Sequence, residues 1–212
     1  QCHLDFRPDF FRYLEEAVHA RIRATATQGI DGYWRHSKQD PGEIKYLINL
    51  LTNNETYFLR ESPHYLLLTK ILFPELLKTR AYYGQPVKIL SAGCASGEEP
   101  YSLVIALVEA FGEGVVDQIE VTGLDINEDV LSKASMGVYG SYSFRGVNPE
   151  LRGHHFDDFV GNRFVLNESI RQKVKFMHHN LVDWPYPENA RMADLIFYRN
   201  VSIYYKHETQ QV

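Results

Sequence analysis

The stretch SAGCASGEEPYS, residues 91–102, decides the fold, because it has the form of a strand end, a glycine turn and a helix start. Before it, VKILSAG (87–93) is a short apolar run that predicts a strand, and after it PYSLVIALVEAF (100–111) has helical periodicity. Gly93 and Gly97 allow the backbone to turn sharply and a ligand to approach without a Cβ atom in the way. The stretch therefore predicts a ligand-binding turn at the carboxyl end of a strand.

Strands and helices alternate through the rest of the chain after Pro86. Three further runs are typical of buried strands: IEVTGLDI (119–126), VKFMHHNL (174–181) and ADLIFYRNV (193–201). A helical pattern, EDVLSKASMG (128–137), lies between the first two. This alternation predicts an α/β fold with a doubly wound, Rossmann-like parallel sheet and helices on both faces. Residues 138–173 are weakly patterned, and we expect a long connection there with a short hairpin around NRFVLNESI (162–170).

The chain before about residue 83 has a different, helical character. Three segments carry apolar residues at helical spacing: DFFRYLEEAVHARIRA (9–24), EIKYLINLL (43–51) and HYLLLTKILF (64–73). Pro41, Pro63 and Pro74 punctuate these segments. We therefore expect a small N-terminal all-helical domain with its linker over residues 1–80, and an α/β domain over residues 81–212.

The composition excludes several classes of protein. The chain has 212 residues and a net charge of −5, which argues against a dedicated nucleic-acid binder. Its two cysteines, Cys2 and Cys94, are far apart and have no metal-ligand spacing, so we expect no metal site and a reducing, cytoplasmic setting. The apolar runs are too short to span a membrane, and no signal peptide is visible. Because the chain begins at Gln1, we expect it to be part of a longer protein.

The residues in the glycine turn favour one kind of cofactor. The dinucleotide fingerprint G-x-G-x-x-G is absent, and Glu98 and Glu99 occupy the first helical turn, where a bound pyrophosphate is disfavoured by anionic side chains. An acidic helix start suits a ligand with positive charge and no phosphate, such as S-adenosylmethionine (AdoMet). The structural alternative is a capping box, in which Ser96 and Glu99 satisfy the helix N-terminus and Pro100 stands early in the helix. This stretch alone does not choose between them.

Asp125 adds a second indication. It closes the second predicted strand, where an acidic side chain can accept hydrogen bonds from both ribose hydroxyls of an adenosine. NAD enzymes share this feature, and an aspartate that caps the following helix is the structural alternative. The acidic turn, the glycines and the ribose acid together favour AdoMet over NAD.

Five blocks of the sequence, in order, resemble the CheR-type methyltransferases. They are TNNETYFLRE (52–61), SAGCASGEEPYSL (91–103), GLDINEDVLSKASMGVY (123–139), HHNL (178–181) and DLIFYRNVSIYY (194–205). Members of this family use AdoMet to methyl-esterify glutamates of methyl-accepting chemotaxis receptors, releasing S-adenosyl-L-homocysteine. The resemblance implies the same AdoMet-dependent reaction here, on the cytoplasmic helical region of such receptors.

The resemblance also implies a set of cofactor-binding residues. They are Asn54, Thr56, Arg60, Gly93, Glu99, Asp125, Asn180, Leu181, Arg199 and Asn200. Asn54, Thr56 and Arg60 stand in N-x-T-x-x-x-R, and Arg199 and Asn200 open R-N-V-x-I-Y, which ends at Tyr204. Each of these residues also has a structural explanation, such as a helix cap, a solvated arginine or a core aromatic. Their joint occurrence in the family's order favours a role in cofactor binding.

Two residues are candidates for the chemistry. A glutamate carboxylate is already ionised at neutral pH, so methyl transfer requires alignment and desolvation rather than a general base. Arg60 is the candidate for orienting that carboxylate, because its planar guanidinium can bind two oxygens. Tyr204 is the candidate for a hydrogen-bonding wall beside the transferred methyl group.

A basic segment near the N-terminus is a candidate for substrate docking. Residues 19–38 contain Arg21, Arg23, Arg35 and Lys38 but only one acid, Asp31. Arg21 and Arg23 are the candidate docking residues. A basic helix can dock on the glutamate-rich methylation helices of a receptor, a role that the resemblance also implies for the N-terminal domain. An ordinary solvated helix face explains the same residues equally well.

The chain departs from the family in two ways. It has Cys94 and Ala95 where the family usually has small or hydroxyl residues. The family's sheet has further strands after R-N-V-x-I-Y. We expect either that these strands, with a receptor-tethering β-subdomain, lie beyond Val212, or that something else completes the sheet. Two alternative functions stay open: a methyltransferase for a small molecule or RNA, and a non-catalytic AdoMet-binding scaffold.

Overall fold

The computed structural model describes residues 8–52, 54–202 and 205, and these divide into two compact units. Of these residues, the first unit comprises 8–52, 54, 202 and 205, and the second comprises 55–201. The sequence predicts a boundary near residue 80, whereas the units divide at Asn54. The reason is that residues 63–82 bury Tyr65, Leu68 and Phe73 in the core of the second unit. The functional assignment of the two parts stays a prediction.

The first unit contains three helices, α1 (Pro8–Thr25), α2 (Gly29–Gln39) and α3 (Pro41–Leu51). Helix α3 begins two residues before the predicted run 43–51, because Asp40 accepts a hydrogen bond from the Gly42 N–H at 2.9 Å and Pro41 follows the cap. The buried centre is partly polar: Glu43 of α3 is 2% exposed, and Tyr33 of α2 is 4% exposed.

The second unit is built on a parallel sheet with the strand order β6-β2-β1-β7. The strands are β1 (Val87–Ala92), β2 (Ile119–Asp125), β6 (Val174–His178) and β7 (Leu195–Phe197). All four fall within runs that the sequence predicts as strands, so the α/β class and the parallel sheet are confirmed. Because the strands are parallel, their carboxyl ends meet at one edge, where open α/β sheets bind ligands.

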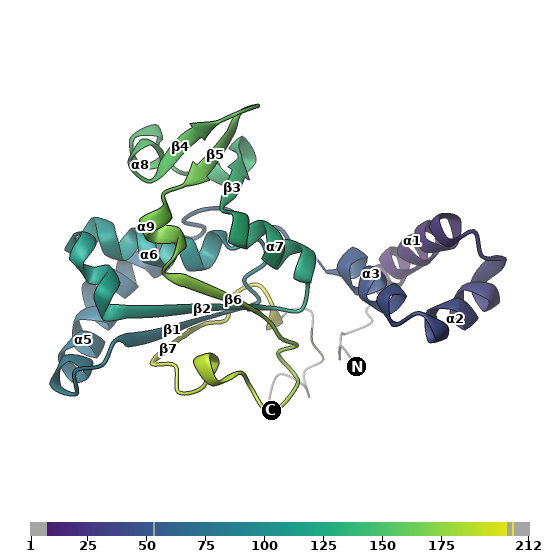
Figure 1. Ribbon diagram of the computed structural model, residues 1–212, viewed down its shortest axis with the longest axis horizontal. Helices are drawn as coiled ribbons and strands as arrows, with labels where there is room; N and C mark the ends of the chain where they lie inside the picture. The colour runs from purple at the N-terminus through teal and green to yellow at the C-terminus, as the bar shows by residue number, and fades with distance from the viewer. Residues whose placement is uncertain (1–7, 53, 203–204, 206–212) are drawn as a thin grey trace. The chain divides into compact units, whose positions relative to one another are not determined.

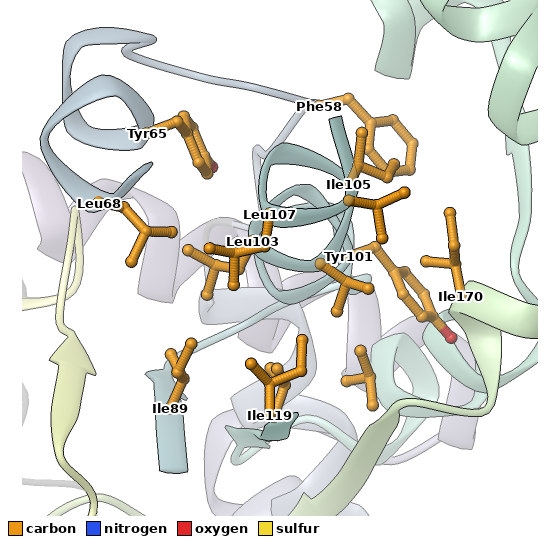
Figure 2. Close-up of a cluster of buried hydrophobic side chains, with 14 of the residues drawn as sticks. Phe58, Tyr65, Leu68, Ile89, Tyr101, Leu103, Ile105, Leu107, Ile119 and Ile170 are labelled. Carbon is orange, nitrogen blue, oxygen red and sulfur yellow. The ribbon is translucent and has the colours of Figure 1, made fainter. Parts of the chain in front are cut away.

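The two faces of this sheet are covered differently. Helix α6 (Glu98–Phe111) lies over one face (Figure 1), and Figure 2 shows its Leu103 and Leu107 near Ile89 of β1 and Ile119 of β2. The helical segment α4 (Pro63–Leu67), η1 (Leu68–Leu72) and α5 (Phe73–Tyr82) packs into the same core cluster. The other face, formed by Leu90, Ala92 and Leu124, packs on side chains of the irregular segment 181–193. Among the described residues this segment takes the place of the helix that a doubly wound sheet predicts.

Residues 138–166 hold a small antiparallel sheet that the sequence does not predict in full. Its strands are β3 (Val138–Gly140), β5 (Arg163–Leu166) and β4 (Phe156–Phe159), in the order β3-β5-β4. The hairpin that the sequence predicts contains only β5 of these three strands. The strands have three or four residues, which is too few to show an alternating pattern. Residues 138–166 thus form a second, smaller sheet within the second unit, and the receptor-tethering β-subdomain stays a prediction.

The remaining helices of the second unit are short. They are η2 (Glu113–Gln118), α7 (Glu128–Met136), η3 (Ser141–Phe144), α8 (Pro149–His155), α9 (Glu168–Arg171) and η4 (Glu188–Ala190). Helix η3 joins the small sheet to the core cluster through Phe144, whose ring stacks on that of Phe58 at 5.2 Å between centroids.

Candidate cofactor-binding site

The turn after β1 is tightly folded and depends on its two glycines. Gly93 has φ +76° and Gly97 has φ +90°, a region that side chains disfavour. A Cβ atom on Gly97 would lie 2.8 Å from the Ala134 Cβ, and one on Gly93 would overlap the Val201 side chain. The turn therefore places backbone without side chains at the carboxyl edge of the sheet. Its glycines also allow the Ala134 and Val201 side chains to pack closely against it.

Asp125 ties this turn to the end of β2. One carboxylate oxygen accepts the Ala95 N–H at 2.8 Å, and the other accepts the Asn127 N–H at 2.9 Å. The residue is 7% exposed, and this burial raises the pKa of its carboxyl group, while the backbone hydrogen bonds oppose the rise. Helix α7 is capped by the side chain of Asn127, so Asp125 is not its N-cap residue.

Glu99 is directed to the sheet rather than into a capping box. Its Oε1 accepts a hydrogen bond from the Ser91 hydroxyl at 2.7 Å, and its Oε2 lies 3.2 Å from a guanidinium nitrogen of Arg199. The N-cap position of α6 is Gly97, which has no side chain to cap the helix, and the Ser96 hydroxyl bonds to Glu98. Burial raises the pKa of Glu99, and Ser91 and Arg199 oppose that rise.

Arg199, at the end of β7, joins three segments of the edge. Its guanidinium donates to the Arg60 carbonyl oxygen at 2.6 Å and lies 3.2 Å from the carboxylates of Glu61 and Glu99. The side chain is only 12% exposed, and its buried Nε has no hydrogen-bond partner among the described residues. A buried N–H without a partner is uncommon in folded proteins.

Arg60 occupies a strained turn beside this network. Its neighbours Leu59 and Glu61 have φ values of +56° and +59°, which are unfavourable for residues with side chains. The Arg60 guanidinium donates to the Glu55 carbonyl oxygen at 3.0 Å and lies near the Tyr57 ring, and the side chain is 28% exposed. The Arg60 charge is one of the factors that oppose the rise in the pKa of Glu99 that burial causes.

The other predicted residues lie in different surroundings. Asn180 and Leu181 follow β6, where the His179 N–H donates to the Asp125 carbonyl oxygen at 2.9 Å, so they continue the same edge. Leu181 also packs on the second face of the sheet. Asn200 follows Arg199, is exposed and has φ +57°.

The N-x-T-x-x-x-R block crosses the division between the two units. Asn54 belongs to the first unit, and its side-chain amide donates to the Thr52 carbonyl oxygen at 3.3 Å. Thr56 belongs to the second unit and is half-buried. Tyr204 lies outside the described residues.

Comparison with known families extends these observations. Residues 54–212 match the family model described as the SAM-binding domain of CheR methyltransferases, SAM being another abbreviation for AdoMet. That match covers more than half of the chain. The chain belongs to the CheR methyltransferase family. The resemblance read from the sequence is thus confirmed, as is AdoMet as the cofactor of this domain.

Three relatives show how far the similarity of this CheR family member extends. The chain is 36% identical to the "Probable biofilm formation methyltransferase WspC" of Pseudomonas aeruginosa, over 93% of this chain and 46% of the relative. It is 34% identical to "Chemotaxis protein methyltransferase 2" of the same species, over 90% and 66%. It is 31% identical to "Chemotaxis protein methyltransferase 2" of Vibrio cholerae, over 91% and 67%. The chain thus spans about half the length of the WspC relatives.

The residues at this edge of the parallel sheet fit AdoMet by charge. Glu61, Glu99 and Asp125 supply carboxylates, whereas Arg60 and Arg199 supply two cationic groups. AdoMet combines a sulfonium, an ammonium, a carboxylate and a ribose. The sulfonium, the ammonium and the ribose hydroxyls need acceptors, whereas the carboxylate needs a donor.

Arg21 has a different environment from that expected of a docking residue. Its guanidinium forms a bidentate pair with Glu43, at 2.6 and 2.8 Å, and lies over the Tyr46 ring at 4.7 Å from the centroid. This pair explains Arg21 as a residue that holds α1 to α3. Arg23 is exposed at the end of α1.

Sequence reasoning missed several residues at the edge. Ser91 is fully buried and holds Glu99, and Glu61 pairs with Arg199. The hydroxyl of Tyr65 lies 3.5 Å from Arg199, and burial raises the pKa of Tyr65 to about 12. Ser91 lies between Leu90 and Ala92 in a buried strand, and a polar residue between apolar ones is the sequence feature that could have indicated its role.

Among the described residues, no helix is both long and apolar enough to cross a membrane.

Proposed function

We propose that this protein is an AdoMet-dependent protein-glutamate O-methyltransferase that forms methyl esters on the cytoplasmic helical region of methyl-accepting chemotaxis receptors. The observation that carries the proposal is the orientation of Glu99, which faces the sheet edge beside Asp125 and Arg199 instead of capping its own helix. The family match and the relatives named chemotaxis protein methyltransferases support it.

The proposed cofactor contacts follow from the chemistry of each side chain. Glu99 accepts hydrogen bonds from the ammonium group, and Asp125 accepts them from the ribose hydroxyls while it keeps the Ala95 N–H in place. Arg199 and Arg60 hold the cofactor's carboxylate by charge. Asn180 and Leu181 lie along the adenine. Asn54, Thr56, Gly93 and Asn200 complete the set.

The protein's contribution to the reaction is alignment. AdoMet supplies a methyl group on a positively charged sulfur, a leaving group that needs no protonation. The acceptor glutamate is already a carboxylate at neutral pH, so one of its oxygens is the nucleophile without a base. Arg60 orients this carboxylate from its strained turn, and Tyr204 forms a polar wall beside the methyl group.

The charge of Arg60 must be balanced for this role to be productive. A guanidinium that bound the carboxylate tightly in the ground state would lower the Michaelis constant without raising turnover. The Arg60 guanidinium donates to the Glu55 carbonyl oxygen and lies 3.9 Å from the Glu61 carboxylate, so its charge is already partly compensated. This arrangement supports orientation rather than neutralisation of the nucleophile.

Substrate docking belongs to the helices of the first unit in this proposal. The exposed cations Arg23, Arg35 and Lys38 offer positive charge to a glutamate-rich receptor helix. Lys38 lies over the ring of Trp34, which is 56% exposed, so charge and apolar surface stand together on α2. The cytoplasmic setting and the division into helical domain and methyltransferase domain are part of the same proposal.

The names of the relatives favour a second output for the same chemistry. The WspC proteins are named for biofilm formation, and one of them is 36% identical to this chain. Methylation of a receptor that controls biofilm formation is therefore the second candidate. The two outputs differ only in the receptor that is methylated.

The proposal is tested by transfer of labelled methyl groups from AdoMet to receptor cytoplasmic fragments by the intact protein. We expect incorporation that disappears when the acceptor glutamates are changed to alanine, and fragments from the two kinds of receptor separate the two outputs. Incorporation that persists without glutamates would contradict the proposal. AdoMet binding without transfer to any fragment would favour the non-catalytic scaffold.

A further inference from the structure

A second acidic residue of the glycine turn, Glu98, is buried and has no part in the cofactor contacts proposed above. It is the first residue of α6 and is only 3% exposed. Burial raises the pKa of its carboxyl group, and hydrogen bonds from Ser96 and Ser143 and the charge of Arg145 oppose that rise. A buried carboxyl group is costly, so its hydrogen-bond partners indicate what it does.

The two partners of the Glu98 carboxylate come from different parts of the second unit. Its Oε2 accepts a hydrogen bond from the Ser96 hydroxyl at 2.7 Å, within the glycine turn. Its Oε1 accepts one from the Ser143 hydroxyl at 2.9 Å, in the η3 helix after the first strand of the small antiparallel sheet. We call these three residues the Glu98 bridge. A further hydrogen bond, from the Tyr139 hydroxyl to the Ser96 carbonyl oxygen at 2.8 Å, runs in parallel with it.

The η3 side of the bridge also holds the segment that carries Arg60. The Phe58 N–H donates to the Ser143 carbonyl oxygen at 2.9 Å, and Arg145 pairs with Glu55 at 2.7 Å. The Phe58 ring packs against those of Tyr139 and Phe144, with centroids 4.8 and 5.2 Å away. Residue 143 therefore contacts both the glycine turn, by its side chain, and the Arg60 segment, by its backbone.

The α6 side of the bridge reaches the same segment by a second route. The Ser102 hydroxyl donates to the Glu98 carbonyl oxygen at 2.6 Å and accepts the Leu59 N–H at 2.9 Å. Leu59 directly precedes Arg60 and has the left-handed backbone noted above. Hydrogen bonds from both sides of Glu98 thus end within two residues of Arg60.

We propose that Glu98 is a positioning residue that, with Ser143 of η3, holds the cofactor turn and the Arg60 segment at a fixed separation. The inference rests on the proposed function, since it concerns the cofactor and the alignment of Arg60. Its physical basis is that a carboxylate with two hydroxyl donors, shielded from water, allows little displacement of either donor. Loss of the bridge frees the turn to shift relative to Arg60.

Ser143→Ala is the sharpest variant, because it removes one hydroxyl at a half-buried position outside the proposed cofactor contacts. In the intact protein we expect AdoMet to bind roughly 3- to 10-fold more weakly, and turnover at saturating AdoMet to fall by a similar factor. Ser141→Ala, at an exposed serine of the same helix, is the matched control and should leave both quantities unchanged.

Variants at Glu98 complete a double-mutant cycle. Glu98→Gln keeps an acceptor oxygen and should retain most of the affinity, whereas Glu98→Ala should lose at least as much as Ser143→Ala. In the Glu98→Ala background, Ser143→Ala should have no additional effect, because the bridge is already broken. Affinity is measured by calorimetry well below the unfolding temperature, so a loss of stability alone does not move it.

The outcomes separate this inference from the proposed function. If Ser143→Ala binds AdoMet and turns over as the unchanged protein does, or if the two substitutions are additive, the bridge has no positioning role. If Glu98→Ala does not fold, the comparison of Ser143→Ala with Ser141→Ala still decides. Absence of AdoMet binding by the unchanged protein would instead overturn the proposed function.

Discussion

Arg60 illustrates how a single residue is fixed by its neighbours rather than by its own side chain. Leu59 and Glu61 on either side adopt left-handed backbone, which costs on the order of 1–3 kcal/mol per residue. The Leu59 N–H bonds to Ser102, and the Arg60 carbonyl oxygen and Glu61 carboxylate both bond to Arg199. Backbone strain that neighbouring contacts hold in place in this way is typical of a functional site in which the orientation of a side chain is important.

Substitution of Arg60 should separate alignment from charge. We expect Arg60→Ala to lower turnover by on the order of 100-fold, because a misaligned nucleophile loses much of the proximity effect. Arg60→Lys keeps the charge but not the planar pair of donors and should recover only a small part of the loss. Steady-state kinetics at saturating AdoMet, with cofactor affinity measured separately, provide the test. Normal turnover by both variants would reduce Arg60 to a cofactor contact.

Asp125 should matter for the cofactor and for the turn together. Asp125→Ala leaves the Ala95 and Asn127 N–H groups without their acceptor, so we expect AdoMet binding to weaken by about 1–3 kcal/mol. The unfolding temperature should fall as well. Asp158→Ala, at an exposed position on β4, is the control. Calorimetry that showed unchanged affinity for Asp125→Ala would remove Asp125 from the proposed site.

At the scale of elements, a part-buried ion pair links the helices of the first unit. Arg21 of α1 pairs with Glu43 of α3, and Tyr33 of α2 donates to the same carboxylate at 3.0 Å. The hydrogen bond from Arg21 is the largest of the interactions that lower the pKa of Glu43 below its ordinary value, although burial opposes it. One carboxylate therefore contacts all three helices.

This pair predicts a dependence of stability on pH. Because the folded pKa of Glu43 is lower than its unfolded value, the pair stabilises the helices above about pH 4.5, and this stability is lost as pH falls through the lowered pKa. Glu43→Gln should reduce hydrogen-exchange protection of α1–α3 by on the order of 1–3 kcal/mol at pH 7. The difference from the unchanged protein should shrink below pH 4. A difference that is independent of pH would show that the charge of Glu43 is unimportant.

The structure gives different environments to Arg21 and Arg23, the two arginines predicted from the sequence as docking residues. Arg21→Glu should disrupt the helices, since it places a second acid beside Glu43. Arg23→Glu, at an exposed position, should raise the Michaelis constant for an acidic receptor fragment and leave AdoMet affinity unchanged.

Salt provides the control for this prediction. The effect of Arg23→Glu should shrink as salt is added, because exposed charges are screened beyond roughly 10 Å at 0.1 M ionic strength. Kinetics at low and high salt provide the measurement. An equal effect at both, or on a short uncharged glutamyl peptide, would argue against electrostatic docking.

At the scale of the whole molecule, the sequence predicts best what local patterns determine. The four strands of the parallel sheet are apolar runs, so both they and the ligand-binding edge were predictable. The small antiparallel sheet was not, because its strands have three or four residues. The pairs Arg21–Glu43 and Glu98–Ser143 join residues 22 and 45 positions apart, and no sequence pattern indicates such contacts.

The central claim is that the intact protein forms a methyl ester on a glutamate side chain, and the chemistry of the product tests it. After labelled methyl transfer from AdoMet to a receptor cytoplasmic fragment, the product is treated with mild alkali. We expect the label to be released as volatile methanol, because carboxyl esters hydrolyse under these conditions. Label that stays on the fragment after alkaline treatment would indicate methylation of nitrogen and would contradict the account.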